Sequence, residues 1–510
     1  MGNTRHDHFC RPFQGSVVFH GPNPGLTPGA ILCRAFGAVE SSPLNESFWS
    51  LLRGKLSLSS TPKTVSSSAR RGRLLRVLGF GFGIAVIIGN TIGAGIFRTP
   101  GSIAEQLPHP WLFLAVWICG GLYALLGAIS LAELGAMIPR SGGQYVFARY
   151  ALGDYAGFIV GWSDWLSTCG SAAAVTLLIG KFAGGLFPAL AGPAKAAAIA
   201  AVIAVGFAAL QWRGIMWGST TQNLTSLLKA LAFLLLIAAA FVFGGGGSIT
   251  TAPTAAPTGF ALAAALVLSL QAVIYTYDGW NGVIYFSEEI TNPGRDIPRS
   301  MFGGVLTVIA IYLLVNLALL YVLPINKIAG QDFAAGAAAE VIFGRYGHPV
   351  FRTLTILSML SAINAYHLMA TRVLFAISRD GLFASQAARV NPGGTPTVAL
   401  FTSTAVAILF IVFGQTFDRV ISVLAFFFVA NYTLSFISVF VLRAREPAKD
   451  RPYRAWGYPL TPALALLGSV LFLVGAIASD TLNSLYALAL LAASYPLFRL
   501  MKSARAAAKD

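Results

Sequence analysis

Two long apolar segments of the chain are interrupted by small and polar residues: Gly89-Asn90-Thr91-Ile92-Gly93-Ala94-Gly95 in the first segment and Thr276-Tyr277-Asp278-Gly279-Trp280-Asn281-Gly282 in the second. Inside a lipid bilayer every backbone N–H and C=O group needs a hydrogen-bond partner. A helix can therefore be interrupted only where protein, water or a ligand supplies the missing partners. Two breaks at corresponding positions of two halves are typical of the ligand site of a transporter built from an inverted repeat.

The composition places the chain in a membrane. Of its 510 residues, 56% are hydrophobic and only 11% are charged, which is far from the composition of a soluble domain. A helix needs about 20 apolar residues to cross about 30 Å of hydrocarbon. Stretches of this kind predict an all-α membrane protein with twelve spans, at residues 77–97, 112–138, 145–173, 195–211, 219–243, 260–287, 301–323, 350–378, 397–413, 420–442, 460–479 and 482–500.

The distribution of charge predicts the orientation in the membrane. The chain has 35 Lys and Arg residues against 19 Asp and Glu residues, and most of the basic ones lie in alternate loops. By the positive-inside rule, both termini are expected in the cytoplasm, with the spans in the cytoplasmic (inner) membrane of a bacterium. Because the basic residues alternate from loop to loop, they form no continuous patch, and we expect no nucleic-acid partner.

Cysteines and short motifs point away from a metal site or an enzyme. Cys10, Cys33, Cys119 and Cys169 have neither a metal-ligand spacing nor a disulfide framework. The sequence contains no P-loop, no HExxH motif and no nucleophile elbow. We therefore expect no cofactor, no metal, no catalytic residue and no ATP-driven step.

The chain divides into three parts. Residues 1–70 are rich in Pro, Gly and Ser and contain no apolar stretch long enough to span a membrane, so we expect a disordered extension. Each break is followed by four unbroken spans, and residues 71–443 therefore predict a five-plus-five inverted repeat with helices 1 and 6 broken. Residues 444–510 hold spans 11 and 12 and a cytoplasmic tail. The Ala-rich stretch from Asp332 to Phe343 predicts a short helix over the outer side.

Four motifs resemble one known family. The segment Ile87–Phe97 is similar to the glycine signature of the amino acid–polyamine–organocation (APC) transporters, and the segment from Tyr277 to Ser300 resembles their second signature. Pro139-Arg140-Ser141-Gly142-Gly143-Gln144-Tyr145 and Ser378-Arg379-Asp380-Gly381-Leu382 match two more. The resemblance covers roughly residues 76–500 and is greatest to the L-type and related bacterial amino acid permeases. It implies a LeuT-like fold and secondary transport of amino acids.

The two breaks suit an amino acid ligand. Its carboxylate and its ammonium must both be hydrogen-bonded when they leave water. At Gly93, Ala94 and Gly95 a new helix begins, so bare N–H groups and the positive helix end would face the carboxylate. Glycine lets the ligand approach the backbone closely. The ammonium is expected to bind unwound carbonyls, those of Ile88, Thr91, Tyr275 and Asp278.

The side chains of the second break allow two interpretations. Asp278 is either a counter-ion for a cationic substrate or an acceptor for N–H groups that the break leaves free. Tyr275, Tyr277 and Trp280 are expected to form aromatic walls of a side-chain pocket, and the alternative for each is packing in the helix core.

Charged residues within or at the end of spans are candidates for coupling and gating. Lys229 matches a family position at which the ammonium resembles a substitute for the sodium ion of sodium-coupled relatives. It is therefore a candidate for proton coupling, with Asp164 as a candidate partner and snorkelling to the surface as the alternative. Glu288 and Glu289 end the sixth span beside cytoplasmic arginines. They are expected to form an inner gate or, alternatively, a solvated acidic helix end.

The sequence therefore predicts a secondary transporter that carries neutral amino acids by alternating access. Proton coupling and amino acid exchange both remain open at this point, and no obligatory protein partner is inferred. A carrier of cationic amino acids or polyamines that uses Asp278 is the first alternative. A sensor that binds an amino acid without transporting it is an alternative of another class.

Overall fold

The computed structural model describes residues 73–245, 257–413, 417–479 and 481–507, and the predicted extension at residues 1–70 lies outside them. The described residues belong to one compact unit, Ser66–Asp510. Within the described ranges the chain is helical, and β-pairing is limited to two isolated bridges, Leu78 with Ile290 and Val390 with Pro396. The predicted all-α class is confirmed for this part of the chain.

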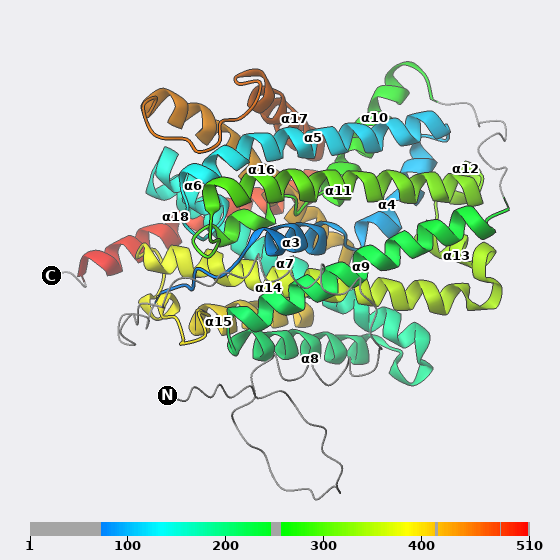
Figure 1. Cartoon of the computed structure of the whole chain (residues 1–510), viewed down its shortest axis with the longest axis horizontal. Helices are drawn as coiled ribbons and strands as arrows, with labels where there is room; N and C mark the ends of the chain where they lie inside the picture. The colour runs from blue at the N-terminus through cyan, green and yellow to red at the C-terminus, as the bar shows by residue number, and fades with distance from the viewer. Residues whose placement is uncertain (1–72, 246–256, 414–416, 480, 508–510) are drawn as a thin grey trace, which may run out of the picture. The chain divides into compact units, whose positions relative to one another are not determined.

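The helices carry the labels used in Figure 1. The first half of the described chain contains α3 (Phe80–Thr91), α4 (Gly95–Gln106), α5 (Pro110–Met137), α6 (Gln144–Leu152), α7 (Asp154–Leu186), η1 (Pro188–Leu190), α8 (Pro193–Trp212) and α9 (Ile215–Phe243). The second half contains α10 (Gly259–Thr276), η3 (Gly282–Phe286), α11 (Pro293–Val322), α12 (Ile325–Ile328), α13 (Ala334–Phe343), η4 (Gly344–Tyr346), α14 (Gly347–Arg379), η5 (Ser385–Ala388), α15 (Thr397–Phe413), α16 (Phe417–Arg445), α17 (Leu460–Ser479) and α18 (Thr481–Ala507).

The helices have the length and composition of membrane spans. Among the described residues, 10 helices can cross a membrane, or up to 11 if α3 and α4, bent by 46° relative to each other, form one broken span. The apolar helix α15 is shorter, with 17 residues. The chain is thus a multi-pass membrane protein, while the count of twelve spans stays a prediction.

Some predicted boundaries differ from the observed ones. The expected span at 145–173 is divided at Gly153, whose φ of +97° only glycine adopts readily, into the short helix α6 and the 33-residue helix α7. The helical part of the expected span at 260–287 ends earlier, at Thr276, where the second break begins. The predicted short helix before Phe343 is present as α13.

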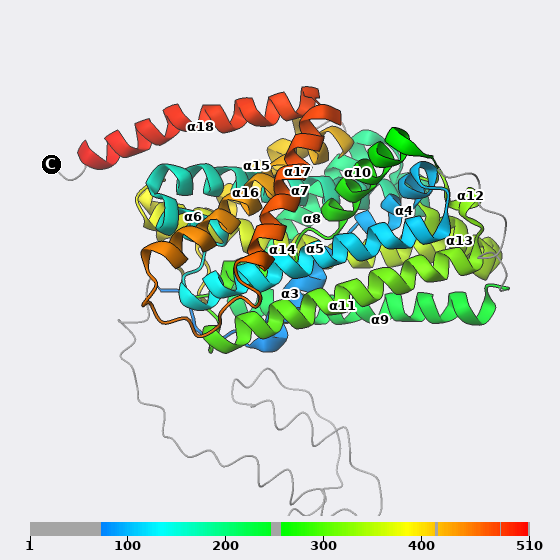
Figure 2. The same cartoon turned by 90° about the horizontal axis from the view of Figure 1, so that it is seen from above.

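The first broken helix lies inside the bundle. α3 packs against α9, α11 and α14, and Figure 1 shows it in the centre of the view between these helices. α11 packs along α5, and α14 packs along α7. The C-terminal helix α18, red in Figure 2, lies at the edge of the bundle, where it packs against α16 and α7.

Close helix packing depends on small residues. α8 buries a stripe of alanines spaced four residues apart, Ala196, Ala200, Ala204 and Ala208. A Cβ atom at Gly180 of α7 would lie 2.4 Å from the carbonyl oxygen of Ala196, so the two backbones approach more closely than a larger residue allows. Small residues take this role in membranes because lipid provides no hydrophobic force that drives helices together.

Candidate functional site

The two breaks touch each other at the centre of the bundle. Gly279 has a φ of +106°, and a Cβ atom there would lie 2.7 Å from Asn90 Nδ2 and 2.9 Å from the Thr91 nitrogen of the first break. The Tyr312 hydroxyl of α11 donates to either the carbonyl of Thr91, at 2.7 Å, or that of Thr276, at 3.0 Å. Tyr312 therefore lies between the ends of α3 and α10 and holds both breaks together.

The first break exposes the start of a helix. The Gly93 N–H turns back to the Thr91 carbonyl at 2.9 Å, and α4 begins at Gly95. In the described part of the chain the N–H groups of Ala94, Gly95 and Ile96 have no hydrogen-bond acceptor. Such bare groups at a helix start attract anions, as a ligand carboxylate requires.

A cavity of about 550 Å³ lies over the two breaks. Six of the predicted substrate residues line it: Thr91, Gly93, Ala94, Gly95, Tyr275 and Asp278. The cavity also reaches Ser102, Glu105, Gln331 and Asp332, which are exposed at the surface on one side of the bundle. We call this side the outer side, and the side on which α14 ends, at Arg379, the inner side.

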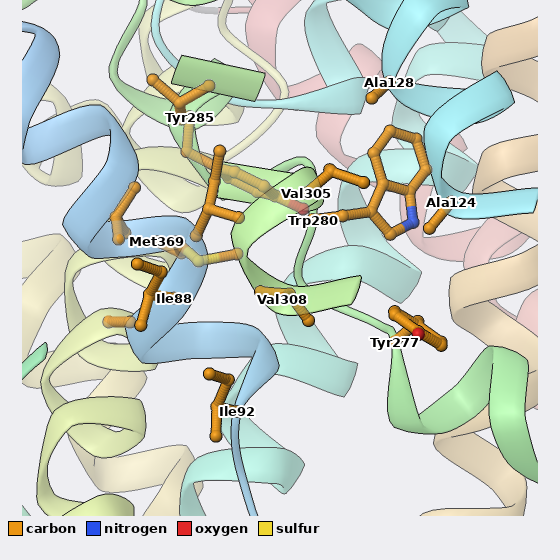
Figure 3. Packing of buried hydrophobic residues seen from close by; sticks show 14 of the residues in the cluster. Ile88, Ile92, Ala124, Ala128, Tyr277, Trp280, Tyr285, Val305, Val308 and Met369 are labelled. Carbon is orange, nitrogen blue, oxygen red and sulfur yellow. The ribbon is translucent and has the colours of Figure 1, made fainter. Parts of the chain in front are cut away.

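The other three predicted substrate residues lie outside the cavity lining. Ile88 is 7% exposed and lies in the hydrophobic core, as Figure 3 shows. The Tyr277 ring lies 4.9 Å from that of Tyr312, and its hydroxyl donates to the Trp117 carbonyl at 3.3 Å. Trp280 lies beside Ala124 and Ala128 in Figure 3, and its ring centroid is 5.0 Å from that of Tyr432. In this conformation all three pack in the core.

Three of the four carbonyls that were expected to bind an ammonium, all but that of Asp278, accept hydrogen bonds within the chain. The Ile88 carbonyl accepts from the Ile92 N–H at 3.1 Å, and the Tyr275 carbonyl accepts from the Asp278 N–H at 3.1 Å. The Thr91 carbonyl accepts from Gly93 and Tyr312. Because a carbonyl oxygen has two lone pairs, that of Ile88 can take one more donor.

Two carboxyl groups inside the bundle each bond a tyrosine hydroxyl. Tyr432 of α16 donates to Asp278 at the edge of the cavity. Tyr285 of η3 donates to Asp164 of α7 at 2.9 Å. Asp164 does not contact Lys229, its suggested partner. Both tyrosines connect the second break to helices that come before or after it in the chain.

Lys229 bonds the first break directly. It is completely buried in α9, and its Nζ donates to the carbonyls of Gly89, at 2.8 Å, and Ile92, at 2.5 Å. The Gly89 carbonyl needs this donor because the Gly93 N–H, its regular helical partner, turns to Thr91. The ammonium therefore replaces a helical hydrogen bond that the break removes, and it does not reach the membrane surface.

Two ion pairs lie at the inner side. Arg372 of α14 donates two hydrogen bonds to Glu289, at 3.0 and 2.9 Å, and both side chains are completely buried. Arg379 pairs with Glu288 at 2.6 Å in a partly exposed position. Both acidic residues thus join the segment after the second break to α14.

Glu289→Gln is expected to destabilise the protein, because it leaves the buried Arg372 guanidinium without a counter-charge. Loss of one partner of a buried pair costs about 3–5 kcal/mol. Glu288→Gln is the matched control: its pair is partly exposed, and such pairs contribute about 1 kcal/mol or less. Thermal unfolding in detergent measures both. Equal melting temperatures for the two variants would contradict the importance of the buried pair.

The structure adds residues that the sequence analysis did not single out. Tyr312 and Tyr432 bond the two breaks from distant helices, and other helices contribute Ser171, Val175, Tyr366 and Phe428 to the cavity lining. The sequence offers one signal for Tyr312 and Tyr432. A tyrosine within an apolar span carries a hydroxyl group, and a buried tyrosine hydroxyl usually finds a hydrogen-bond partner. Which partner it finds depends on contacts across more than 150 residues of chain.

Comparison with known proteins supports the resemblance that the four motifs indicate. The family model for amino acid permeases matches residues 80–494. The serine/threonine exchanger SteT of Bacillus subtilis (strain 168) is 31% identical over 443 residues, which is 85% of this chain and 98% of the relative. The Asc-type amino acid transporter 1 of Mus musculus is 27% identical over 396 residues, 76% of this chain and 74% of the relative.

A third relative, the b(0,+)-type amino acid transporter 1 of Mus musculus, is 26% identical over 428 residues, which is 82% of this chain and 86% of the relative. The family match and these relatives agree with the multi-pass helical architecture. The chain therefore belongs to the amino acid permease family of the APC superfamily, and it is an amino acid transporter of the membrane rather than an enzyme.

Proposed function

We propose that the protein carries small neutral amino acids across the cytoplasmic membrane by alternating access. The observation that carries the proposal is the cavity over the two breaks. It reaches the outer surface at Glu105 and Asp332, while the buried pair of Glu289 and Arg372 closes the inner side. A site open to one side and closed to the other is one of the two end states that alternating access requires.

The lining favours a small substrate with a polar side chain. Hydroxyl groups and small side chains face the cavity beside the breaks, from Thr91, Thr99, Ser171, Ala272 and Thr276. The name of one relative, a serine/threonine exchanger, points in the same direction. Hydroxyl groups at these positions can exchange hydrogen bonds with a substrate hydroxyl.

A cationic amino acid is the second candidate substrate, because the carboxyl group of Asp278 could bind its positive charge. This carboxyl group lines the cavity, but the Tyr432 hydroxyl bonds one of its oxygens. A substrate ammonium or guanidinium would have to share the carboxylate with this hydroxyl. Uptake of serine and threonine in preference to lysine and arginine is therefore expected, and the reverse preference would favour the cationic alternative.

Uptake into proteoliposomes tests the proposal and the mode of coupling together. The purified chain is expected to take up a labelled neutral amino acid from the outside. Uptake that needs unlabelled amino acid inside the vesicles indicates exchange, and uptake driven by an imposed pH gradient indicates proton symport. Specific binding without uptake under either condition would favour a sensor.

The proposal includes the arrangement of the chain in the membrane. Residues 71–443 form the transport core, with the inverted repeat in ten spans and breaks in the first and sixth, and residues 444–510 form two further spans and a tail. Both termini lie in the cytoplasm. This arrangement is supported by the alternation of basic loops and by the meeting of the two breaks at the centre of the bundle.

Deletion of residues 1–70 is expected to leave uptake unchanged. No stretch of this segment is apolar enough to form a span of the bundle. Uptake by the truncated chain, normalised to the amount of inserted protein, measures the effect. A loss of uptake at normal insertion would show that the segment contributes to transport.

A further inference from the structure

The buried face of α9 changes character along its length. From Ser219 to Lys229 its buried residues are polar, and from Phe233 to Ala240 they are apolar. The polar part includes Gln222, Ser226 and Lys229, which are spaced to lie on one side of a helix. This side packs against α3, the inner half of the first broken helix.

Gln222 and Ser226 bond the backbone of α3 below the break. The Ser226 hydroxyl donates to the Ala85 carbonyl at 2.6 Å, and Gln222 Nε2 donates to the same carbonyl at 3.2 Å. Ser361 of α14 lies 2.9 Å from the Ser226 oxygen and accepts from Gln222 at 3.2 Å. Two side chains of α9 thus bond one turn of α3, Ser361 of α14 bonds both of them, and all three are buried.

Gly89 allows this close approach. A Cβ atom at position 89 would lie 1.9 Å from Gln222 Nε2, 2.5 Å from Ser361 Oγ and 2.6 Å from Ser226 Oγ. The three side chains therefore occupy the space that any other residue at position 89 would fill. Gly89 of the first signature therefore allows α3 to pack closely against this cluster, in addition to its place in the break.

The cluster is connected to the inner side of the bundle. Asn364 donates to the Gln222 side-chain oxygen at 2.8 Å, and Gln211 at the end of α8 donates to Asn364 at 2.9 Å. α3 itself starts at the inner gate, where the Leu78 N–H donates to the Glu289 carbonyl at 2.9 Å. Movement of α3 away from α9 and α14 would therefore open a path from the breaks to the inner side.

We propose that Gln222, Ser226 and Ser361 form a hydrogen-bond latch that holds α3 against α9 and α14 and must break before the inner side opens. These three are positioning residues, because Gln222 and Ser226 bond the backbone of α3, Ser361 bonds those two side chains, and none of the three lines the cavity. The inference rests on the alternating access of the proposed function. Polar side chains suit a surface that separates, since water can replace α3 as their partner when the path opens. An apolar face would resist wetting and would not reopen as easily.

Cysteine accessibility tests the latch. Ala365 of α14 is completely buried one turn below Ser361 on the same side of the helix, so Ala365→Cys reports whether the path beside α3 is open. The background is the full chain with Cys10, Cys33, Cys119 and Cys169 replaced by alanine. A membrane-impermeant maleimide is applied from the inner or the outer side of oriented vesicles.

Gln222→Leu and Ser226→Ala are each expected to raise the rate of labelling from the inner side at least threefold, with no increase from the outer side. Thr225→Ala is the matched control, because the Thr225 hydroxyl bonds only the carbonyls of its own helix, those of Thr221 and Gln222. Ser226→Ala keeps the test valid if Gln222→Leu does not fold.

Equal labelling rates in the latch variants and in Thr225→Ala would overturn the latch, as would a faster reaction from the outer side. This result is distinct from a failure of the proposed function. If the reporter chain transports amino acids and its labelling is unaffected by the latch variants, only the latch is wrong. If the chain binds but never transports, the function itself is wrong.

Discussion

Gly95→Leu is expected to abolish amino acid binding while the protein still inserts and folds. Gly95 is the first residue of α4, and its N–H group is one of those left bare over the cavity. A Cβ atom there would lie 3.0 Å from Thr276 Cγ2 and 3.3 Å from Thr276 Cα, so a leucine side chain must either separate the two breaks or turn into the space for the ligand carboxylate. Both responses remove the site.

Thermal shift or calorimetry with a neutral amino acid measures the effect, which we expect to exceed 100-fold in affinity, or about 3 kcal/mol. Gly81→Leu is the control on the same broken helix, because Gly81 is exposed and no atom lies within 4 Å of its Cβ position. It should bind as the unaltered chain does. Unchanged affinity in Gly95→Leu would show that the carboxylate binds elsewhere.

The breaks were predictable because they violate a strong local rule. Glycine and polar residues inside an apolar span have few explanations in a bilayer, and the motif around Gly93 marks the position of the break to within a residue or two. Lys229 was predictable as a candidate for the same reason, since a lone charge within a span needs a partner. That its partners are the Gly89 and Ile92 carbonyls required the structure.

Side-chain direction at the second break was not predictable. Tyr275, Tyr277 and Trp280 are close in sequence, yet only Tyr275 lines the cavity in this conformation. Gly279 has a φ of +106°, which no α-helical residue has, so the helical spacing of the residues before it does not extend to Trp280. Trp280 consequently packs on α5, where Gly127 makes room for its ring.

For the polar face of α9, the sequence predicted the pattern but not the neighbour that it contacts. Gln222, Ser226 and Lys229 have the spacing of one helix face, but the same pattern could face another helix, lipid headgroups or water. Only the positions of Ala85 and Ser361 reveal that the pattern faces α3 and α14. Contacts between residues so distant in the chain depend on the whole fold.

Lys229→Ala is expected to lower the rate of transport about 10- to 100-fold while substrate binding changes less. A hydrogen bond from a charged donor contributes about 1.5–3 kcal/mol, and each 1.4 kcal/mol is a factor of ten. Without the ammonium, the carbonyls of Gly89 and Ile92 lose the donor that joins α3 to α9. The closed, loaded form therefore loses stability, although the N–H groups that bind the carboxylate lie on α4.

The pH profile of uptake tests whether Lys229 also takes part in coupling. If the protonated amine holds the first break to α9 and the neutral amine releases it, uptake by the unaltered chain depends on pH and uptake by Lys229→Ala does not. Lys229→Arg is the control that keeps a positive charge at all pH values. Lys229→Arg should retain substrate binding. Its uptake, like that of Lys229→Ala, should not depend on pH, because an arginine does not release its proton. If Lys229→Ala keeps both its rate and its pH profile, the contact with the break is structural and coupling must reside at another group.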